Sequence, residues 1–137
     1  MSNSIYHKAN RSVYSLNAHI VFVTKYRQKV LTLEIINRLE EIFIETCTKW
    51  RARVRELNAE SDYCHILIDY PPDIALTKLI ANLKTVSSRY LRKEFPQVKA
   101  AYKKPVLWTA SYFVASCGGV TVEQLKKYVQ NQSRPTK

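Results

Sequence analysis

Residues Tyr63–Tyr70 read YCHILIDY, and this short segment alternates between two kinds of side chain. In an extended strand, one face would carry Tyr63, His65, Leu67 and Asp69, and the other Cys64, Ile66 and Ile68. Two prolines, Pro71 and Pro72, follow at once and end the strand, because proline supplies no N–H to a sheet. The segment is therefore predicted to be a strand with one buried face and one polar face.

The segments on both sides of this strand alternate between strand and helix patterns. The predicted elements are strands at 14–26, 51–60 and 107–116, helices at 32–49, 73–95 and after the two glycines, a loose arm at 1–12 and a basic connection at 96–105. Thr32 and Asp73 occupy helix N-cap positions, and Ser61-Asp62 forms a tight hairpin turn. This order predicts a single α+β domain over residues 1–137, with a ferredoxin-like βαββαβ antiparallel sheet and an extra C-terminal helix.

The last predicted helix carries a tyrosine and a glutamine on one face. Its signals are a capping-box spacing of Thr121 and Gln124 directly after Gly118-Gly119, and an apolar stripe of Val122, Leu125 and Val129. Tyr128 and Gln132 are four residues apart, so a phenol and a carboxamide can serve one site together. From the residues alone, packing is the commoner role of a tyrosine, and both interpretations stay open.

The composition is strongly basic. The 137 residues include 22 Lys and Arg against 11 Asp and Glu, a formal charge of +11, and 46% apolar residues. This excess points to a globular domain with a polyanionic partner, most commonly a nucleic acid. No apolar run approaches the roughly 20 residues that span a bilayer, and a signal-peptide core is missing, which predicts a cytoplasmic protein without a membrane partner. The three cysteines lack zinc-site spacing and are expected to be reduced, mostly buried thiols.

Basic side chains gather at two places along the chain. Lys25 and Arg27 flank Tyr26 in a turn whose charges and aromatic ring suit phosphates and bases. Along the 73–95 helix, a stripe opposite the apolar one holds Lys78, Asn82, Thr85, Arg89 and Arg92. We expect this stripe to face phosphates, or at minimum to be a solvated surface. The first strand also carries Asn17 and His19 on one face, as the candidate floor of a polar groove.

Taken in order, the motifs of the chain resemble those of the HUH single-tyrosine transposases, which move small IS200-type insertion sequences as single-stranded DNA. The matching pieces are the His19 strand with Thr24-Lys25-Tyr26-Arg27, Asp62 to Ile68, Leu83-Lys84, Ser87-Ser88-Arg89, Leu107-Trp108, Tyr112-Phe113-Val114, Gly118 and Tyr128-Val129-Gln130-Asn131-Gln132. The resemblance implies binding of hairpin ends of single-stranded DNA by a homodimer whose subunits share active sites. The expected DNA-binding residues are Lys25, Arg27, Lys78, Lys84, Arg89 and Arg92.

The resemblance also implies a divalent metal, Mg²⁺ or Mn²⁺, and a tyrosine nucleophile. In this family two histidines that flank one hydrophobic residue hold the metal, together with a glutamine one turn beyond the tyrosine. Carried across, His65 is the second metal histidine, Gln132 is the third ligand, and Tyr128 attacks a phosphodiester to form a 5′-phosphotyrosine.

The position of the first family histidine is occupied by Tyr63. A phenol with an unperturbed pKa of about 10 is a poor ligand for a hard divalent metal at neutral pH. We therefore expect either an altered, weakened site or a metal with fewer protein ligands, helped by His19 or Asp69 if the fold brings them near.

Two other functions remain open from the sequence. A catalytically silent protein of the same fold would bind DNA hairpins without cutting them, because the basic features do not depend on Tyr63. An RNA-binding ferredoxin-like module is disfavoured, because the aromatic-rich strand motif of that class is absent.

Overall fold

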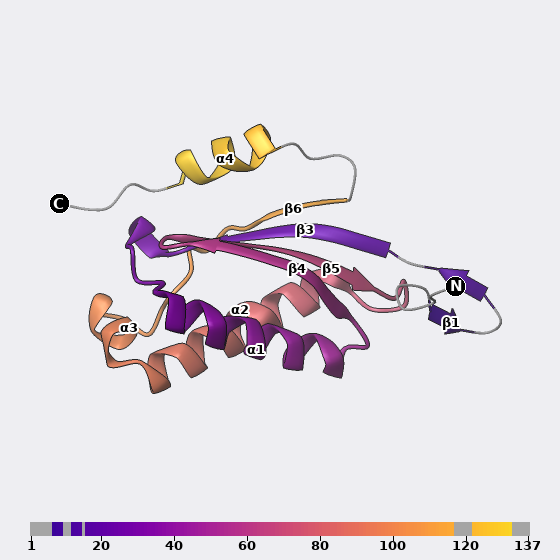
Figure 1. Ribbon diagram of the computed structural model, residues 1–137, viewed down its shortest axis with the longest axis horizontal. Coiled ribbons are helices and arrows are strands. Elements are labelled where there is room, and N and C mark those ends of the chain that lie inside the picture. Colours follow the sequence, from indigo (N-terminus) through magenta and orange to yellow (C-terminus); the bar gives the residue numbers. More distant parts are fainter. Residues whose placement is uncertain (1–6, 10–11, 15, 117–121, 133–137) are drawn as a thin grey trace.

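The fold is built around one antiparallel sheet whose two faces have different surroundings. The computed structural model describes residues 7–9, 12–14, 16–116 and 122–132. On one side of the sheet lie helices α1 (Leu33–Lys49), α2 (Leu76–Glu94) and α3 (Pro96–Ala101), and on the other lies α4 (Val122–Gln130) (Figure 1). The C-terminal helix therefore covers the face of the sheet that α1 and α2 leave open.

The strands of this sheet follow the order β4-β5-β3-β6, and each neighbouring pair is antiparallel. Their bounds are β3 (Leu16–Val23), β4 (Arg53–Glu60), β5 (Tyr63–Tyr70) and β6 (Phe113–Ser116). One helical crossover joins β3 to β4 and another joins β5 to β6, with the Ser61-Asp62 hairpin between β4 and β5. The predicted ferredoxin-like sheet with an extra C-terminal helix is confirmed.

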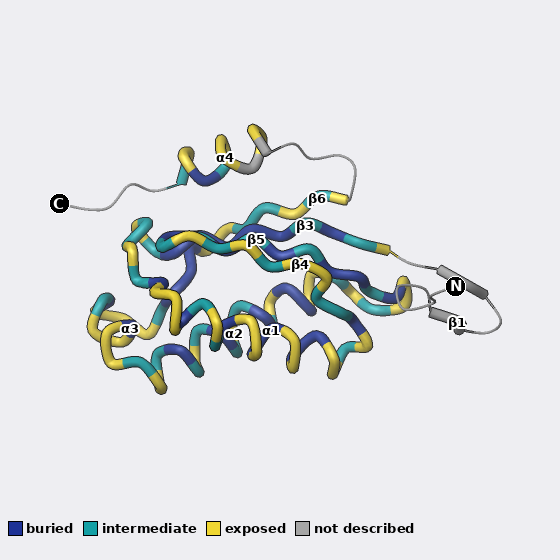
Figure 2. Tube along the Cα trace, in the orientation of Figure 1, coloured by how far each residue is buried: buried dark blue, intermediate teal, exposed yellow. Residues whose placement is uncertain are grey.

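The buried core lies between the sheet and helices α1 and α2 (Figure 2). Its fully buried large side chains are Ile20 and Phe22 of β3, Ile66 and Ile68 of β5, Ile35, Leu39, Ile42 and Phe43 of α1, and Leu79, Ile80, Leu83 and Leu91 of α2. Each such side chain contributes about 1.5–3 kcal/mol on burial. The alternation predicted for Tyr63–Tyr70 is confirmed, since Cys64 and the two isoleucines enter this core. Cys47 and Cys64 are buried free thiols, as predicted.

The opposite face of the sheet holds a smaller apolar cluster. Val21 and Val23 of β3 pack there against Val129 of α4, with the rings of Tyr63, Phe113 and Tyr128 against them. Strand register places Val21 opposite His65 and Val23 opposite Tyr63. The helix that carries Tyr128 is thus seated over the polar face of β5.

The N-terminal segment differs from the prediction. Residues His7–Ala9 (β1) and Ser12–Tyr14 (β2) pair as a two-stranded antiparallel sheet, so the expectation of a loose arm is wrong for them. The central strand accordingly begins at Leu16 and ends at Val23, just before the short turn η1 (Lys25–Arg27). Three-residue strands are held by backbone hydrogen bonds and leave no periodic pattern in the sequence.

Of the two predicted helix N-caps, one is confirmed and the other is wrong. The Thr32 hydroxyl oxygen accepts a hydrogen bond from the Ile35 N–H at 3.3 Å, which confirms the cap of α1. Asp73 does not cap α2, which begins at Leu76 without a side-chain cap. Its carboxylate lies 3.1 Å from the Arg51 guanidinium instead, because an ion pair from the loop before β4 competes for it.

Two predictions for the region after α2 are also wrong. Residues 96–105 contain the helix α3, which begins at Pro96, where the fixed φ of proline suits a first helical turn. The last strand begins at Phe113 and not at 107. Trp108 makes only an isolated bridge with Thr24, and its indole N–H donates to the buried Ser87 hydroxyl at 3.0 Å. Between this bridge and Phe113 the ladder is broken, and the carbonyl oxygens of Thr109 and Ala110 accept hydrogen bonds from the Lys84 ammonium group.

Some predictions lie outside the described residues. These are the Gly118-Gly119 break, the Thr121 cap, Cys117 and the side chains of Val122 and Leu125. None of the helices in the described part of the chain is long and apolar enough to cross a membrane.

Candidate functional site

A pocket of about 710 Å³ opens on the α4 side of the sheet. Its lining includes His19 and Val21 of β3, Glu56 and Asn58 of β4, Tyr63 and His65 of β5, Arg27 of η1, and Lys126, Val129 and Gln130 of α4. The predicted polar groove over His19 is therefore present. A few polar groups converge in it beside an apolar wall, which is typical of a binding site.

His19 and His65 meet in this pocket. The Nδ1 atom of His19 lies 2.8 Å from the Nε2 atom of His65, which is hydrogen-bonding distance. The ring planes differ by 13° and the ring centres are 5.0 Å apart, so the nitrogens point toward one another between the rings. One imidazole donates an N–H and the other accepts, since two lone pairs would repel at this distance. The β3–β5 pairing makes the two residues diagonal neighbours on one face.

The environment of His65 favours its neutral form. Burial lowers the pKa of this imidazole, the neighbouring His19 lowers it further, and the Glu56 carboxylate acts in the opposite direction. A neutral imidazole has one nitrogen lone pair free for a proton or a metal ion.

Tyr63 shares the pocket as a neutral phenol. Burial raises its pKa above the ordinary value, and the carboxylates of Glu60 and Asp62 raise it further. The side chain therefore stays protonated at neutral pH and lacks the charged oxygen that a hard metal prefers. Its ring packs against the cluster of Val21 and Val23.

Tyr128 and Gln132 converge on a serine and not on the histidines. The Oγ atom of Ser111 lies 3.3 Å from the Tyr128 hydroxyl and donates a hydrogen bond to the Gln132 side-chain oxygen at 3.1 Å. The Gln132 amide donates to the Tyr128 carbonyl oxygen at 3.3 Å. The phenol and the carboxamide therefore lie on one side as expected, although α4 ends at Gln130 and Gln132 follows it. Gln132 does not line the histidine pocket.

The residues expected to hold the family metal do not form a complete ligand set. Tyr63 is a neutral phenol, and the Gln132 side chain is hydrogen-bonded to Ser111. Within the described residues, no three His, Cys, Asp or Glu side chains lie together in a way that could hold an ion. Tyr63, His65 and Gln132 as arranged here therefore do not fit Mg²⁺ or Mn²⁺.

Asp69 belongs to a separate ionic cluster. Its buried carboxylate lies 3.4 Å from the Arg53 guanidinium and 3.6 Å from that of Arg55, both on β4. Asp69 thus links β4 to β5 and does not line the histidine pocket.

The six expected DNA-binding residues fall into two groups. Lys25 and Arg27 come from η1 at the end of β3, where the Arg27 Nε atom lies 3.5 Å from the Asp62 carboxylate. The others, Lys78, Lys84, Arg89 and Arg92, belong to α2, which lies on the side of the sheet away from α4.

Lys84 is held by the protein itself. Its ammonium group donates to the carbonyl oxygens of Thr109 and Ala110 at 2.8 and 3.0 Å, and it lies 5.8 Å from the centre of the Tyr112 ring. Burial lowers its pKa. These contacts anchor the segment that leads to Ser111.

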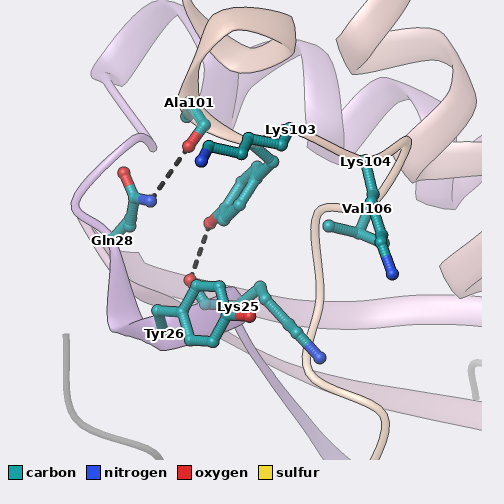
Figure 3. A pocket seen from close by; sticks show the side chains of 8 residues that line it. Lys25, Tyr26, Gln28, Ala101, Lys103, Lys104 and Val106 are labelled. Atoms are coloured by element: carbon teal, nitrogen blue, oxygen red, sulfur yellow. Dashed lines mark hydrogen bonds between the residues drawn. The ribbon is translucent and has the colours of Figure 1, made fainter. Parts of the chain in front are cut away.

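A second pocket, of about 470 Å³, lies beside η1. Lys25 and Tyr26 line it from one side, and Lys103 and Lys104 line it from the segment after α3 (Figure 3). The Tyr102 hydroxyl donates to the Lys25 carbonyl at 2.9 Å and ties the two segments together. Tyr26 has a φ of 58°, a left-handed conformation that costs a non-glycine residue on the order of 1–3 kcal/mol. This turn holds an exposed tyrosine ring beside three lysines.

Most of the chain matches one known protein family. The family described as "Transposase IS200 like" matches residues 12–132. The chain belongs to this family. The match spans every element from β2 to α4, and therefore both the histidine pocket and the tyrosine helix.

Two relatives of the chain are described as transposases. The chain is 28% identical to the ISDra2 transposase TnpA of Deinococcus radiodurans over 125 residues, which cover 91% of this chain and 89% of that protein. It is also 28% identical to the transposase for insertion sequence element IS200 of Salmonella typhimurium, over 83% of this chain and 74% of that protein.

Solved structures agree with the fold of this IS200-like transposase. A Deinococcus radiodurans crystal structure assigned as a transposase superposes with a TM-score of 0.85 at 30% identity, covering 93% of this chain and 98% of that one. A REP-associated tyrosine transposase bound to a REP hairpin superposes with a TM-score of 0.56 at 10% identity, covering 90% of this chain and 68% of that one. The second likeness shows a shared fold.

Two features of the site could not be predicted from the sequence. Ser111 as the partner of Tyr128 and Gln132 carries no local signal, because the contact joins the segment before β6 to α4. Gln130 enters the histidine pocket although the sequence motif singles out Gln132. Both depend on how α4 is rotated over the sheet.

Proposed function

We propose that this IS200-like transposase binds hairpin ends of single-stranded DNA and cuts and rejoins strands through Tyr128. The observation that supports the proposal is the position of Tyr128 in the structure. Val129 anchors the tyrosine helix over the histidine pocket, and the Tyr128 ring packs against the same apolar cluster as Tyr63. The hairpin in the structure of the REP-associated relative supports the ligand class.

The proposed reaction needs no external energy source. The Tyr128 oxygen forms a bond to the phosphorus of a phosphodiester while the bond from phosphorus to the 3′ oxygen breaks. The phenolic proton is released, and the departing 3′ oxygen takes up a proton to become a free hydroxyl. A 5′-phosphotyrosine remains, and a 3′-hydroxyl at a new junction reverses the step. Arg27 and Lys126 in the pocket bring positive charge to the phosphate.

End-labelled DNA provides the direct test of this proposal. A hairpin strand is incubated with the protein and Mn²⁺ and separated under denaturing conditions. A 3′-end label should stay on the protein as the 5′-linked adduct, while a 5′-end label should leave with the 3′-hydroxyl fragment. The opposite distribution of labels would contradict the assigned polarity.

A catalytically silent hairpin-binding protein is the second candidate. One specific observation favours it: burial raises the pKa of the Tyr63 phenol, which occupies the position that the resemblance assigns to the first metal histidine. In that case the protein should bind the labelled hairpin, and no covalent adduct should form whether the label is at the 3′ end or at the 5′ end. A tenfold preference for RNA competitors of the same hairpin would instead favour an RNA-binding module.

We expect DNA binding to be electrostatic and to include Arg89 and Arg92 of α2. Both side chains lie off the apolar stripe, so replacing both by alanine should weaken binding without unfolding the protein. Each lost phosphate contact should reduce the slope of log affinity against log salt by about 0.7–0.9. Fluorescence anisotropy of a labelled hairpin across salt concentrations measures this slope. Affinity that barely changes between low and physiological salt would rule out the electrostatic interface.

Lys84→Met is the matched comparison in the same titration. Because its ammonium group binds two carbonyl oxygens, we propose that Lys84 stabilises the protein and does not contact DNA. The salt slope should stay at the parent value, and the free energy of unfolding should fall by about 1–3 kcal/mol. A reduced slope at unchanged stability would return Lys84 to the DNA interface.

We propose that the active protein is a homodimer in which α4 completes the site of the partner subunit. Among the α4 side chains that the structure describes, Val129 is the buried one, so the helix is held lightly. Mixing Tyr128→Phe with His65→Ala should then restore part of the cleavage that each variant lacks, because one site of the mixed dimer has both residues. If α4 serves its own subunit, mixing restores nothing.

A further inference from the structure

We propose that His19 takes the place of the missing family histidine, so that His19 and His65 form a cross-strand imidazole pair that binds a divalent metal ion. The family pair flanks one hydrophobic residue on a single strand, whereas this pair joins β3 to β5. The inference deepens the proposed function at the same pocket. Metal binding can nevertheless be measured without DNA.

The spacing of the two imidazoles is close to what one ion requires. The His19 Nδ1 and His65 Nε2 atoms are 2.8 Å apart. Two nitrogens in adjacent positions around an octahedral ion, each about 2.1 Å from it, lie roughly 3.0 Å apart. To bind one ion, both facing nitrogens would present lone pairs, so the ring that now donates would carry its proton on its other nitrogen, with a small rotation of each ring. Tyr63 cannot do this, because its phenol oxygen keeps its proton.

The surroundings of the pair leave room for a ligand. No third His, Cys, Asp or Glu side chain in the described part of the chain completes a cluster with His19 and His65. The remaining positions of the ion are therefore left to water and to phosphate oxygens. Three carboxylates line the same pocket and offset its three cationic side chains; the carboxylates are Glu56, Glu60 and Asp62, and the cations are Arg27, Lys29 and Lys126.

The donor set determines which ions are preferred. Imidazole nitrogens suit first-row transition metals, whereas Mg²⁺ prefers oxygen ligands. We therefore expect Co²⁺ and Mn²⁺ to bind, Co²⁺ more tightly than Mn²⁺, and Mg²⁺ to compete weakly. This order separates a histidine site from a site made only of carboxylates and phenol.

The experiment is a Mn²⁺ titration of the full chain followed by electron paramagnetic resonance, in which the signal of the free ion falls on binding. The variants are His19→Gln and His65→Gln, because a glutamine amide keeps a hydrogen bond but is a poorer ligand. Each should raise the dissociation constant about tenfold or more. His7→Gln, which changes the third histidine of the chain, on β1, is the matched control and should bind like the parent.

Several outcomes would overturn the proposal. His19→Gln with the parent affinity, beside a weakened His65→Gln, would show that His65 binds the ion without His19. A parent protein that binds neither Mn²⁺ nor Co²⁺ would exclude the site. Urea unfolding of each variant separates loss of ligand from loss of fold. Hairpin affinity and the Tyr128 adduct are measured separately, so either result leaves the proposed DNA chemistry to its own test.

Discussion

Tyr128→Phe is expected to abolish the covalent protein–DNA adduct and strand cleavage while hairpin binding persists. The substitution removes only the attacking oxygen, and loss of a catalytic nucleophile can cost on the order of 10⁶-fold in rate. The ring keeps its contacts with Phe113 and the valine cluster, so the helix should stay in place. Denaturing electrophoresis of 3′-labelled hairpin DNA measures the adduct, and anisotropy measures binding.

Tyr112→Phe is the matched control for this experiment. Tyr112 lies next to Ser111 and contacts Lys84 through its ring, so losing its hydroxyl should leave the adduct yield unchanged. Mass spectrometry of the parent adduct should place the DNA on the peptide that contains Tyr128. Adduct formation by Tyr128→Phe at the parent rate would overturn the assignment of the nucleophile.

Tyr63→His is expected to raise divalent-metal affinity about 10- to 100-fold, and strand cleavage with it. The substitution restores the family histidine beside His65 and adds an imidazole to the His19–His65 pair. Tyr63 is half-buried on the pocket side of β5, and the core behind Cys64 is on the other face, so the fold should survive. The smaller ring fills less of the valine cluster, which should cost roughly 0.5–3 kcal/mol of stability. The same Mn²⁺ titration and the adduct assay measure both gains.

Tyr63→Phe separates the effect of the new ligand from that of the lost hydroxyl. It keeps the ring against Val21 and Val23 and supplies no donor, so its metal affinity should equal that of the parent. An affinity gain in both variants would mean that the phenol hydroxyl obstructs the site. Strong cleavage by the parent with no gain from Tyr63→His would show that the natural arrangement is a working variant.

Local sequence determined the elements of this protein and the faces of its strands. Alternation along Tyr63–Tyr70 placed His65 on one face and Cys64 on the other, and the hydroxyl of Thr32 marked the start of α1. Helical spacing also identified the buried stripe of α2. These features depend on neighbours along the chain, and a side-chain period of two or 3.6 residues is visible without tertiary contacts.

Boundaries and partners that involve distant residues were decided by the tertiary structure. Asp73 forms an ion pair with Arg51 and does not cap α2, and the ladder of the last strand is interrupted where Lys84 binds the carbonyl oxygens of Thr109 and Ala110. Neither contact has a local signal.

Some features of the candidate site were likewise predictable from local sequence, and others depend on the tertiary structure. The sequence placed Tyr128 and Gln132 on one side of a helix and singled out His65, His19 and Tyr63 as candidates. Only the pairing of β3 with β5 brings His19 to 2.8 Å from His65 across 46 positions of sequence. Only the packing of α4 on the sheet turns Tyr128 toward Ser111. Strand register and helix rotation are set by the burial of many distant side chains at once, so they cannot be read from any single motif.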